Sequence, residues 1–320
     1  MSVGDCGRAP LPGTVVPVIE VNRLTKRYGR VTAVNDLSFT VRSGHVTGFL
    51  GPNGAGKSTT LRMILGLHAP TSGSATVAGR DCRGLRRALR QVGALLDAGD
   101  VHGGRTARDQ LRFLARSNAL PAGRVEEVLR EVGLSAAADR RIGGFSLGMR
   151  QRLGIAGALL GDPPVLIFDE PLNGLDPEGV LFVRGLFRRL AAEGRTVFVS
   201  SHLMTEMEHT ADRLIVVGRG ELLADEAVAE FAARGSQRSV QVRTTDPAEL
   251  VAALTAGGAR VAQAPDGLLT VTGPDATAIA RTALDRGLLI HELTSRTGTL
   301  EQAFMELTGS SVEYAAGASA

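Results

Sequence analysis

Nine consecutive residues near the start of the chain have the types and spacing needed to hold phosphate groups. Glycines let the backbone turn so that several N–H groups point at one anion, and a helix beginning behind them adds further donors. In the pattern G-x-x-x-x-G-K-[ST], the lysine reaches the β- and γ-phosphates and the hydroxyl is a hard ligand for Mg²⁺. The stretch therefore predicts a site for a nucleoside triphosphate with Mg²⁺. Its residues are Gly51, Pro52, Asn53, Gly54, Ala55, Gly56, Lys57, Ser58 and Thr59.

The lysine in this stretch is unusual for the chain. Lys26 and Lys57 are its only two lysines, whereas arginine is abundant. A planar guanidinium does not replace a compact ammonium at a phosphate site. The choice of lysine at 57 therefore favours a phosphate-binding role over a chance glycine-rich turn.

Two acids follow a run of four apolar residues, 165–168. A buried strand there would hold Asp169 beside the phosphate loop, where it can bind Mg²⁺ through water. Glu170 would then project to the position of an attacking water and act as general base. The alternative is a pair of surface acids at a strand end, which the preceding phosphate loop disfavours.

The elements that must position these residues alternate along the chain. Strands are expected at 18–22, 31–34, 37–41, 45–50, 75–78, 92–97, 165–168, 196–200, 214–217 and 221–224. Helices are expected at 58–66, 107–117, 124–132, 147–160, 176–194 and just after 202. Strands alternating with helices predict a largely parallel α/β sheet with right-handed crossovers. An antiparallel β piece would precede the phosphate loop, and residues from about 100 to 160 would form a helical insertion.

The pattern restarts beyond residue 236. Residues 236–310 alternate as β-α-β-β-α-β, the order of a ferredoxin-like unit. We expect a small C-terminal α+β domain there, a flexible tail at 1–16 and a disordered tail at 311–320.

Composition limits the classes of protein that the chain can be. Its 320 residues, 43% hydrophobic and 22% charged, are typical of a soluble globular protein with one large and one smaller domain. No apolar run approaches the roughly 20 residues needed to cross a bilayer, and no secretory signal is recognisable. Cys6 and Cys82 form neither a disulfide framework nor a metal-binding spacing, which favours the reducing cytoplasm. The net charge of +3 is small and the arginines are scattered, so the charge does not indicate nucleic acid.

Further motifs complete a recognisable set. In chain order they are Tyr28, the phosphate loop, Phe145-Ser-Leu-Gly-Met-Arg-Gln-Arg152, Phe168-Asp-Glu-Pro171, Asn173-Gly-Leu-Asp176 and Ser200-Ser-His202. Over residues 17–225 the chain resembles the ATP-binding subunit of an ABC transporter. The resemblance implies a P-loop ABC ATPase fold with an antiparallel β subdomain and a helical insertion, and ATP with Mg²⁺ as cofactors.

The resemblance also implies roles for single residues. Tyr28 would stack on adenine, and His202 would contact the γ-phosphate. Asp176 would communicate between subunits as well as capping a helix. The signature segment, which would face the ATP of a partner chain, differs from L-S-G-G-Q at three of five positions; its expected contact residues are Ser146, Leu147, Gly148 and Met149.

Asp97 departs from the family pattern, which usually has glutamine at this position. An aspartate could still bind Mg²⁺, but whether it preserves coupling to a membrane partner stays open. Together with the signature variant and the C-terminal segment 299–308, it resembles the bacterial drug-resistance and antibiotic-efflux branch.

The resemblance implies a working arrangement. Two chains, as a homodimer or a heterodimer with a paralogous subunit, would enclose two ATP and drive a separate integral-membrane permease that exports a drug or other small molecule. The chain itself has no span and would lie in the cytoplasm, peripheral on the inner face of the cell membrane. One alternative is a non-transport ABC ATPase acting on nucleic acid or ribosomes, although no clustered basic run supports direct nucleic-acid binding. Another is that 236–310 acts as a regulatory or dimerising module.

Overall fold

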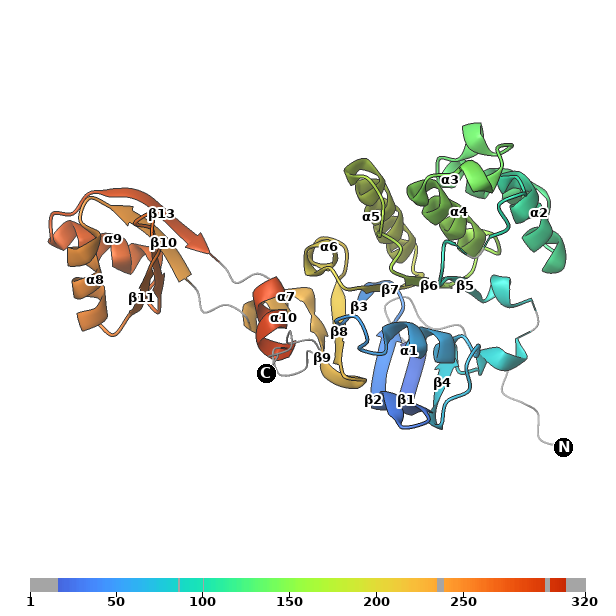
Figure 1. Cartoon of the computed structure of the whole chain (residues 1–320), viewed down its shortest axis with the longest axis horizontal. Coiled ribbons are helices and arrows are strands. Elements are labelled where there is room, and N and C mark those ends of the chain that lie inside the picture. Colours follow the sequence, from blue (N-terminus) through green and yellow to red (C-terminus); the bar gives the residue numbers. More distant parts are fainter. Residues whose placement is uncertain (1–16, 86, 100, 235–238, 297–299, 309–320) are drawn as a thin grey trace, which may run out of the picture. The chain divides into compact units, whose positions relative to one another are not determined.

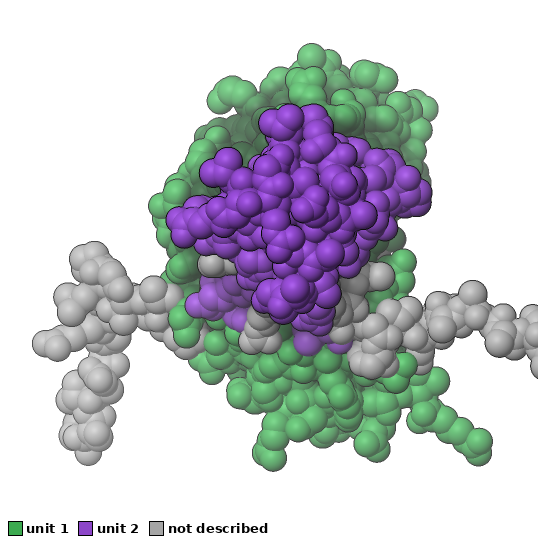
Figure 2. All heavy atoms as spheres, turned by 90° about the vertical axis from the view of Figure 1, so that its left-hand side faces the viewer, with its two compact units in different colours: residues 1–225 green, residues 226–320 purple. Residues whose placement is uncertain are grey.

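The computed structural model describes residues 17–85, 87–99, 101–234, 239–296 and 300–308. The chain divides into two compact units, Met1–Asp225 and Glu226–Ala320, which are coloured green and purple in Figure 2. The tails expected at 1–16 and 311–320 lie outside the described residues.

The first unit is built on a six-stranded sheet. Its spatial order is β5 (Val92–Leu95), β6 (Val165–Asp169), β7 (Thr196–Ser201), β3 (Val46–Leu50), β8 (Arg213–Gly218) and β9 (Glu221–Ala227). The pairs β5–β6, β6–β7, β7–β3 and β3–β8 are parallel, as the alternation of strands and helices predicts. Strands β3, β6 and β7 are buried along their whole length, which is typical of central parallel strands.

Helices pack beside the strands of this sheet (Figure 1). Helix α1 (Lys57–Ile64) follows β3 and also contacts the second sheet, while α5 (Pro177–Ala192) and α6 (Met204–Glu208) contact β7. The core between the sheets includes the rings of Phe39, Phe49 and Phe198, whose centroids lie 5.3 to 5.9 Å apart. Helix α1 therefore starts at the carboxyl end of a central strand, where its N-terminal N–H groups are available for an anion.

The second sheet of this unit is antiparallel, as expected, but its strands are longer than the sequence predicts. It has the order β2 (Val31–Arg42), β1 (Pro17–Tyr28) and β4 (Ser72–Val77). The strands expected at 31–34 and 37–41 form a single strand, because Asn35-Asp36 makes an irregularity and not a turn. Asp36 has φ of 49° and its N–H donates to Oγ1 of Thr25 on β1. The β1–β2 register shifts around this point.

A helical insertion separates β5 from β6, as predicted. Its helices are α2 (Ala107–Ser117), α3 (Gly123–Glu131) and α4 (Leu147–Leu159), with 3₁₀ turns at Ser135–Ala137 and Ile142–Gly144. Two further 3₁₀ turns, Cys82–Gly84 and Ala88–Arg90, precede β5. Thr106 and Ser146 cap α2 and α4, since Thr106 accepts from the N–H of Asp109 and Ser146 accepts from that of Met149.

The second unit contains a four-stranded antiparallel sheet. Its elements are α7 (Val228–Arg234), β10 (Ser239–Thr244), α8 (Pro247–Ala256), β11 (Arg260–Gln263), β12 (Leu269–Thr272), α9 (Ala276–Asp285), β13 (Ile290–Arg296) and α10 (Leu300–Thr308). The strand order is β11-β12-β10-β13. The sequence did not predict α7. This helix, the first of the unit in sequence, packs against α10, the last. Within the described residues, no helix of either unit has the length and apolar character needed to cross a bilayer.

Candidate nucleotide-binding site

The loop between β3 and α1 forms a concave cradle. Gly54 and Gly56 have φ of 84° and 94°, which side chains rarely adopt. A Cβ atom at Gly56 would lie 2.4 Å from the carbonyl oxygen of Ala33, and one at Gly51 would lie 2.5 Å from that of Val217. The cradle has a volume of about 260 Å³ and is lined by Ala33, residues 52–59 and Glu170. At positions 51 and 56 only glycine avoids a clash with neighbouring backbone. The cradle also lies at the start of helix α1, which has no acid in its first turn, and this environment fits a triphosphate.

The ammonium group of Lys57 lies inside this cradle. Its Nζ donates to the carbonyl oxygen of Gly51 at 2.6 Å and is 3.6 Å from Oε1 of Glu170. Burial lowers the pKa of Lys57 from its ordinary value of 10.5, and the nearby carboxylates of Glu170 and Asp169 oppose that shift. A polyanion in the cradle would stabilise the charged form further.

Strand β6 ends at the first of the two acids expected at the site, Asp169, which is buried beside β7, and Glu170 follows it. The parallel register places Asp169 next to Ser200, whose hydroxyl donates to Oδ1 of Asp169 at 2.5 Å. The same hydroxyl oxygen accepts from the N–H of Glu170 at 3.0 Å. Sequence reasoning missed Ser200 as a site residue. The one available signal was its place at the end of the strand that pairs with β6.

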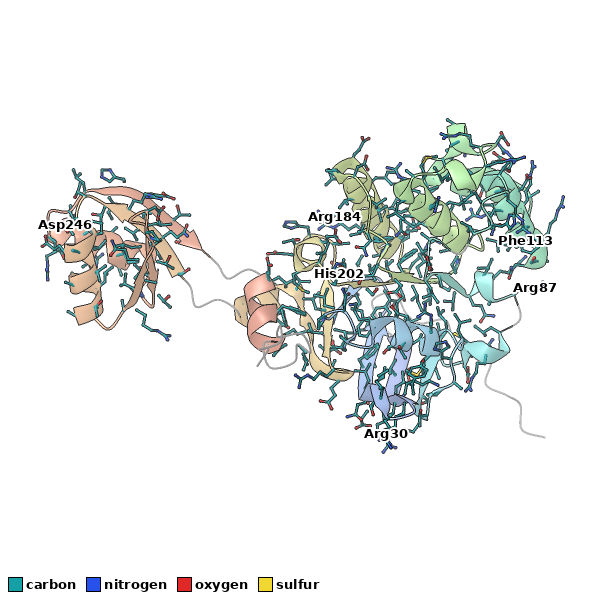
Figure 3. The ribbon with its side chains drawn as sticks, viewed as in Figure 1. Arg30, Arg87, Phe113, Arg184, His202 and Asp246 are labelled. Carbon is teal, nitrogen blue, oxygen red and sulfur yellow. The ribbon has the colours of Figure 1, made fainter. Side chains whose placement is uncertain are left out.

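Glu170 connects the cradle to the predicted γ-phosphate sensor. Its Oε2 lies 2.9 Å from Nδ1 of His202, which directly follows β7. His202 is labelled in Figure 3. Asn173 approaches the same oxygen through Nδ2 at 3.4 Å. Lys57, Glu170 and His202 are therefore linked in one chain of polar contacts, although Glu170 lies 113 positions after Lys57 and 32 positions before His202.

The signature residues and Asp176 lie together in a different cavity. This cavity has a volume of about 320 Å³ and is lined by Ser146, Leu147, Gly148, Met149, Arg152, Gly174, Leu175 and Asp176. Leu147 packs so closely on Gly174 that a Cβ there would lie 2.1 Å from its Cδ2. Asp176 caps α5 by accepting from the N–H of Gly179 at 2.9 Å. Among the described residues, this cavity and the phosphate cradle have no lining residue in common.

Tyr28 is half exposed and does not line the cradle. Its hydroxyl lies 3.1 Å from Nδ1 of His68, a residue just beyond α1. The ammonium of Lys26 lies 5.1 Å from the centroid of the tyrosine ring and donates to the carbonyl oxygen of Ala69 at 2.6 Å. The ring is thus held by the end of β1 and by the segment that follows the phosphate-loop helix.

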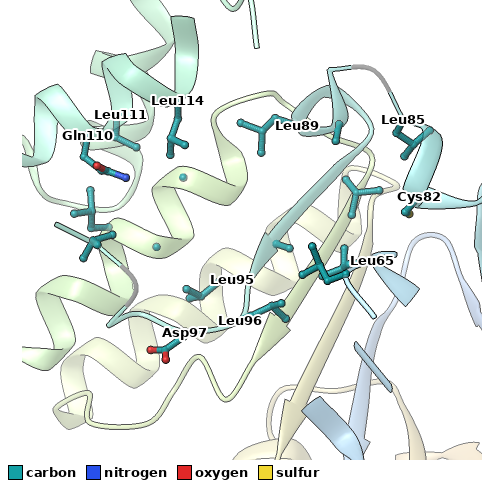
Figure 4. A pocket seen from close by; sticks show the side chains of 18 residues that line it. Leu65, Cys82, Leu85, Leu89, Leu95, Leu96, Asp97, Gln110, Leu111 and Leu114 are labelled. Carbon is teal, nitrogen blue, oxygen red and sulfur yellow. The ribbon is translucent and has the colours of Figure 1, made fainter. Parts of the chain in front are cut away.

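Asp97 does not line the cradle but an apolar groove of about 440 Å³ (Figure 4). Side chains of α2, such as Leu111 and Leu114, and Leu153 of α4 line this groove. Oδ1 of Asp97 accepts from the N–H of Gly99 at 2.6 Å. In this structure the carboxylate therefore supports its own turn.

Comparison with known proteins places the site in a family context. Residues 34–173 match the ABC transporter family, and residues 238–301 match a domain of unknown function. The bacitracin transport ATP-binding protein BcrA of Bacillus licheniformis is 42% identical over 211 residues, which cover 65% of this chain and 69% of BcrA. The Nod factor export ATP-binding protein I of Rhizobium leguminosarum is 34% identical, with 94% of this chain and 98% of that protein covered.

Solved structures resemble the first unit. An ATP-binding subunit of an ABC transporter is 28% identical, with a TM-score of 0.62, over 67% of this chain and 91% of that one. A dimeric bacterial ABC transporter cassette is 26% identical, with a TM-score of 0.60, over 66% of this chain and 98% of its own.

Proposed function

This chain belongs to the ATP-binding subunits of ABC transporters, and we propose that it dimerises around two ATP–Mg²⁺ to power export of a drug or other small molecule through a separate permease. It binds and hydrolyses ATP as a subunit of a transport complex. One observation carries the dimer proposal. The phosphate cradle and the signature cavity of a single chain have separate linings, so a second chain is needed to bring a signature segment to each nucleotide.

The residues of the cradle divide the work on ATP. Main-chain N–H groups of residues 54–59 and Nζ of Lys57 would bind the phosphates. Ser58 and Asp169 would hold Mg²⁺, the latter through water, and the ion would neutralise phosphate charge. Glu170 would accept a proton from the attacking water, and His202 would orient Glu170 from the other side.

Tyr28 would provide a surface for adenine. The Tyr28 hydroxyl lies 3.1 Å from Nδ1 of His68, and His68 follows α1, the helix that begins at the cradle. The tyrosine is therefore connected to the cradle through α1. We propose that the signature residues Ser146 to Met149, at the N-terminus of α4, approach the γ-phosphate held by the partner chain. Asp176 would lie at the same interface.

The groove beside Asp97 is the surface that we propose for the permease. It is lined largely by leucine, valine and alanine side chains, which suits an apolar helix face. Binding there would place the chain on the inner face of the cell membrane. The names of BcrA and of the Nod factor protein, which concern bacitracin transport and Nod factor export, support an exported small molecule. They do not favour an action on nucleic acid.

The dimer proposal is tested with Glu170→Gln. This variant keeps the cradle but removes the proton acceptor, so it should bind ATP–Mg²⁺, hydrolyse it slowly and accumulate as a dimer in light scattering. Lys57→Ala in the same background is the matched control and should stay monomeric. A Glu170→Gln chain that remains monomeric at saturating ATP–Mg²⁺ would contradict the proposal.

A further inference from the structure

Gln151 is a buried amide on helix α4 that reaches toward the acid of the cradle. Its side chain is 7% exposed, and its Nε2 lies 3.4 Å from the carbonyl oxygens of both Glu170 and Asn173. Among the described residues, its Oε1 has no hydrogen-bond partner although it is fully buried. The amide nitrogen thus spans two carbonyls of the segment that follows β6.

The backbone that Gln151 touches is in an unfavourable conformation. Glu170 has φ of 50°, in the left-handed region that non-glycine residues rarely adopt. Such a conformation persists only where the surroundings impose it. The N–H of Glu170 is held by Ser200 of β7 at 3.0 Å, and its carbonyl oxygen faces Gln151 of α4. The orientation of the Glu170 carboxylate therefore depends on two elements, one in the sheet and one in the helical insertion.

We propose that Gln151 is a positioning residue that links the signature segment to Glu170 of the same chain. The inference rests on the proposed dimer, in which Ser146 faces the ATP held by the partner. Ser146 caps α4 and Gln151 lies five residues further on, a rise of about 7.5 Å along one helix. Contact of Ser146 with the partner's ATP would move α4, and Gln151 would carry that movement to the base acting on this chain's own ATP.

The unpartnered oxygen argues that stability did not select the amide. A buried acceptor without a partner is destabilising, whereas an apolar side chain of similar shape avoids that cost. Leucine would suit a purely structural position between α4 and the segment after β6. The amide at position 151 thus has a role beyond packing. The contacts of its Nε2 with the carbonyl oxygens of Glu170 and Asn173 indicate that this role is to position Glu170.

The test compares Gln151→Leu with the wild-type full-length chain. Turnover at saturating ATP should fall about tenfold or more, because a base displaced by a fraction of an ångström loses its alignment. The KM for ATP should stay unchanged, and the melting temperature should stay the same or rise. In the Glu170→Gln background, Gln151→Leu should leave ATP-driven dimerisation unaltered. Gln91→Leu, the same change at a half-buried position before β5, is the control and should keep full turnover.

A double-mutant cycle tests the link to Ser146. If Gln151 transmits the contact made by Ser146, the fold-loss in turnover of the double variant will be well below the product of the fold-losses of Ser146→Ala and Gln151→Leu. Independent losses that multiply would overturn the inference, as would wild-type turnover in Gln151→Leu.

A turnover loss matched by a lower melting temperature in both Gln151→Leu and Gln151→Met would assign a structural role instead. Should Gln151→Leu not fold, Gln151→Met undergoes the same measurements. A monomeric Glu170→Gln chain would remove the dimer and this inference together, whereas a normal dimer with wild-type turnover in Gln151→Leu would remove the inference alone.

Discussion

Oε2 of Glu170 lies 2.9 Å from Nδ1 of His202, and these two residues directly follow neighbouring strands of the central sheet. The other carboxylate oxygen of Glu170 faces Lys57 at 3.6 Å. The acid therefore lies between the residue expected to bind the phosphates and the residue expected to sense them. We therefore expect a change in phosphate charge at Lys57 to act on Glu170 and, through it, on His202.

Ser200 holds both acids of the site, so Ser200→Ala should reduce stability and turnover together. The substitution removes the donor to Asp169 and the acceptor for the N–H of Glu170. We expect the free energy of unfolding to fall by about 1–3 kcal/mol, measured by denaturant unfolding. Thr196→Val, at the other end of β7, is the matched control, because among the described residues the buried Thr196 hydroxyl has no partner. Equal losses in both variants would argue against a special role for Ser200.

The pKa of Lys57 makes a prediction about alkaline pH. Burial lowers this pKa below 10.5, so between the lowered value and 10.5 the unfolded chain binds more protons than the folded chain. Raising the pH through that interval therefore stabilises the folded wild-type chain. Without nucleotide, the free energy of unfolding of wild type minus that of Lys57→Met should increase as the pH rises from neutral toward 10.5. A difference that stays constant or decreases would mean that the ammonium is not desolvated in the cradle.

Lys26 should support adenine binding and leave phosphate binding unaffected. Its ammonium faces the Tyr28 ring at 5.1 Å, and a cation over a partly exposed ring contributes roughly 0.5–1 kcal/mol. Lys26→Met should therefore weaken ATP binding by about two- to fivefold, measured by calorimetry. Affinity for inorganic triphosphate should not change. Arg27→Met, on the adjacent exposed residue, is the control; if it weakens ATP binding equally, net charge and not the ring contact is responsible.

Asp97 should not be needed for Mg²⁺ binding. Its Oδ1 accepts from the N–H of Gly99, and the residue does not line the cradle. Asn can make the same turn, so Asp97→Asn should leave the Mg²⁺ concentration for half-maximal ATPase activity unchanged. A large increase in that concentration would show that the carboxylate moves to the metal when ATP binds.

The parts of the site that the sequence predicted are local in the chain. The phosphate loop and the two acids at the end of β6 each depend on neighbours within a few residues, and spacing alone identifies them. Ser200 and Gln151 contact Glu170 across 30 and 19 positions. Such contacts follow from strand register and helix packing, which periodicity does not reveal.

The errors in the predicted fold have the same origin. Asn35-Asp36 has the composition of a turn, but pairing with β1 keeps it inside one strand. Helix α7 was missed because its seven residues make a weak pattern, and its packing partner α10 lies some seventy positions away. The β-α-β-β-α-β order of the second unit was visible because each of its elements has its own pattern and turn signals.

The most direct test is a crystal structure of the Glu170→Gln chain with ATP and Mg²⁺. We predict phosphate oxygens within hydrogen-bonding distance of the main-chain nitrogens of residues 54–59 and of Nζ of Lys57. Asp169 and residue 170 should face the same triphosphate, and Ser146 of a second chain should approach its γ-phosphate. A triphosphate bound elsewhere, or one whose γ-phosphate lies far from positions 169 and 170, would contradict the account.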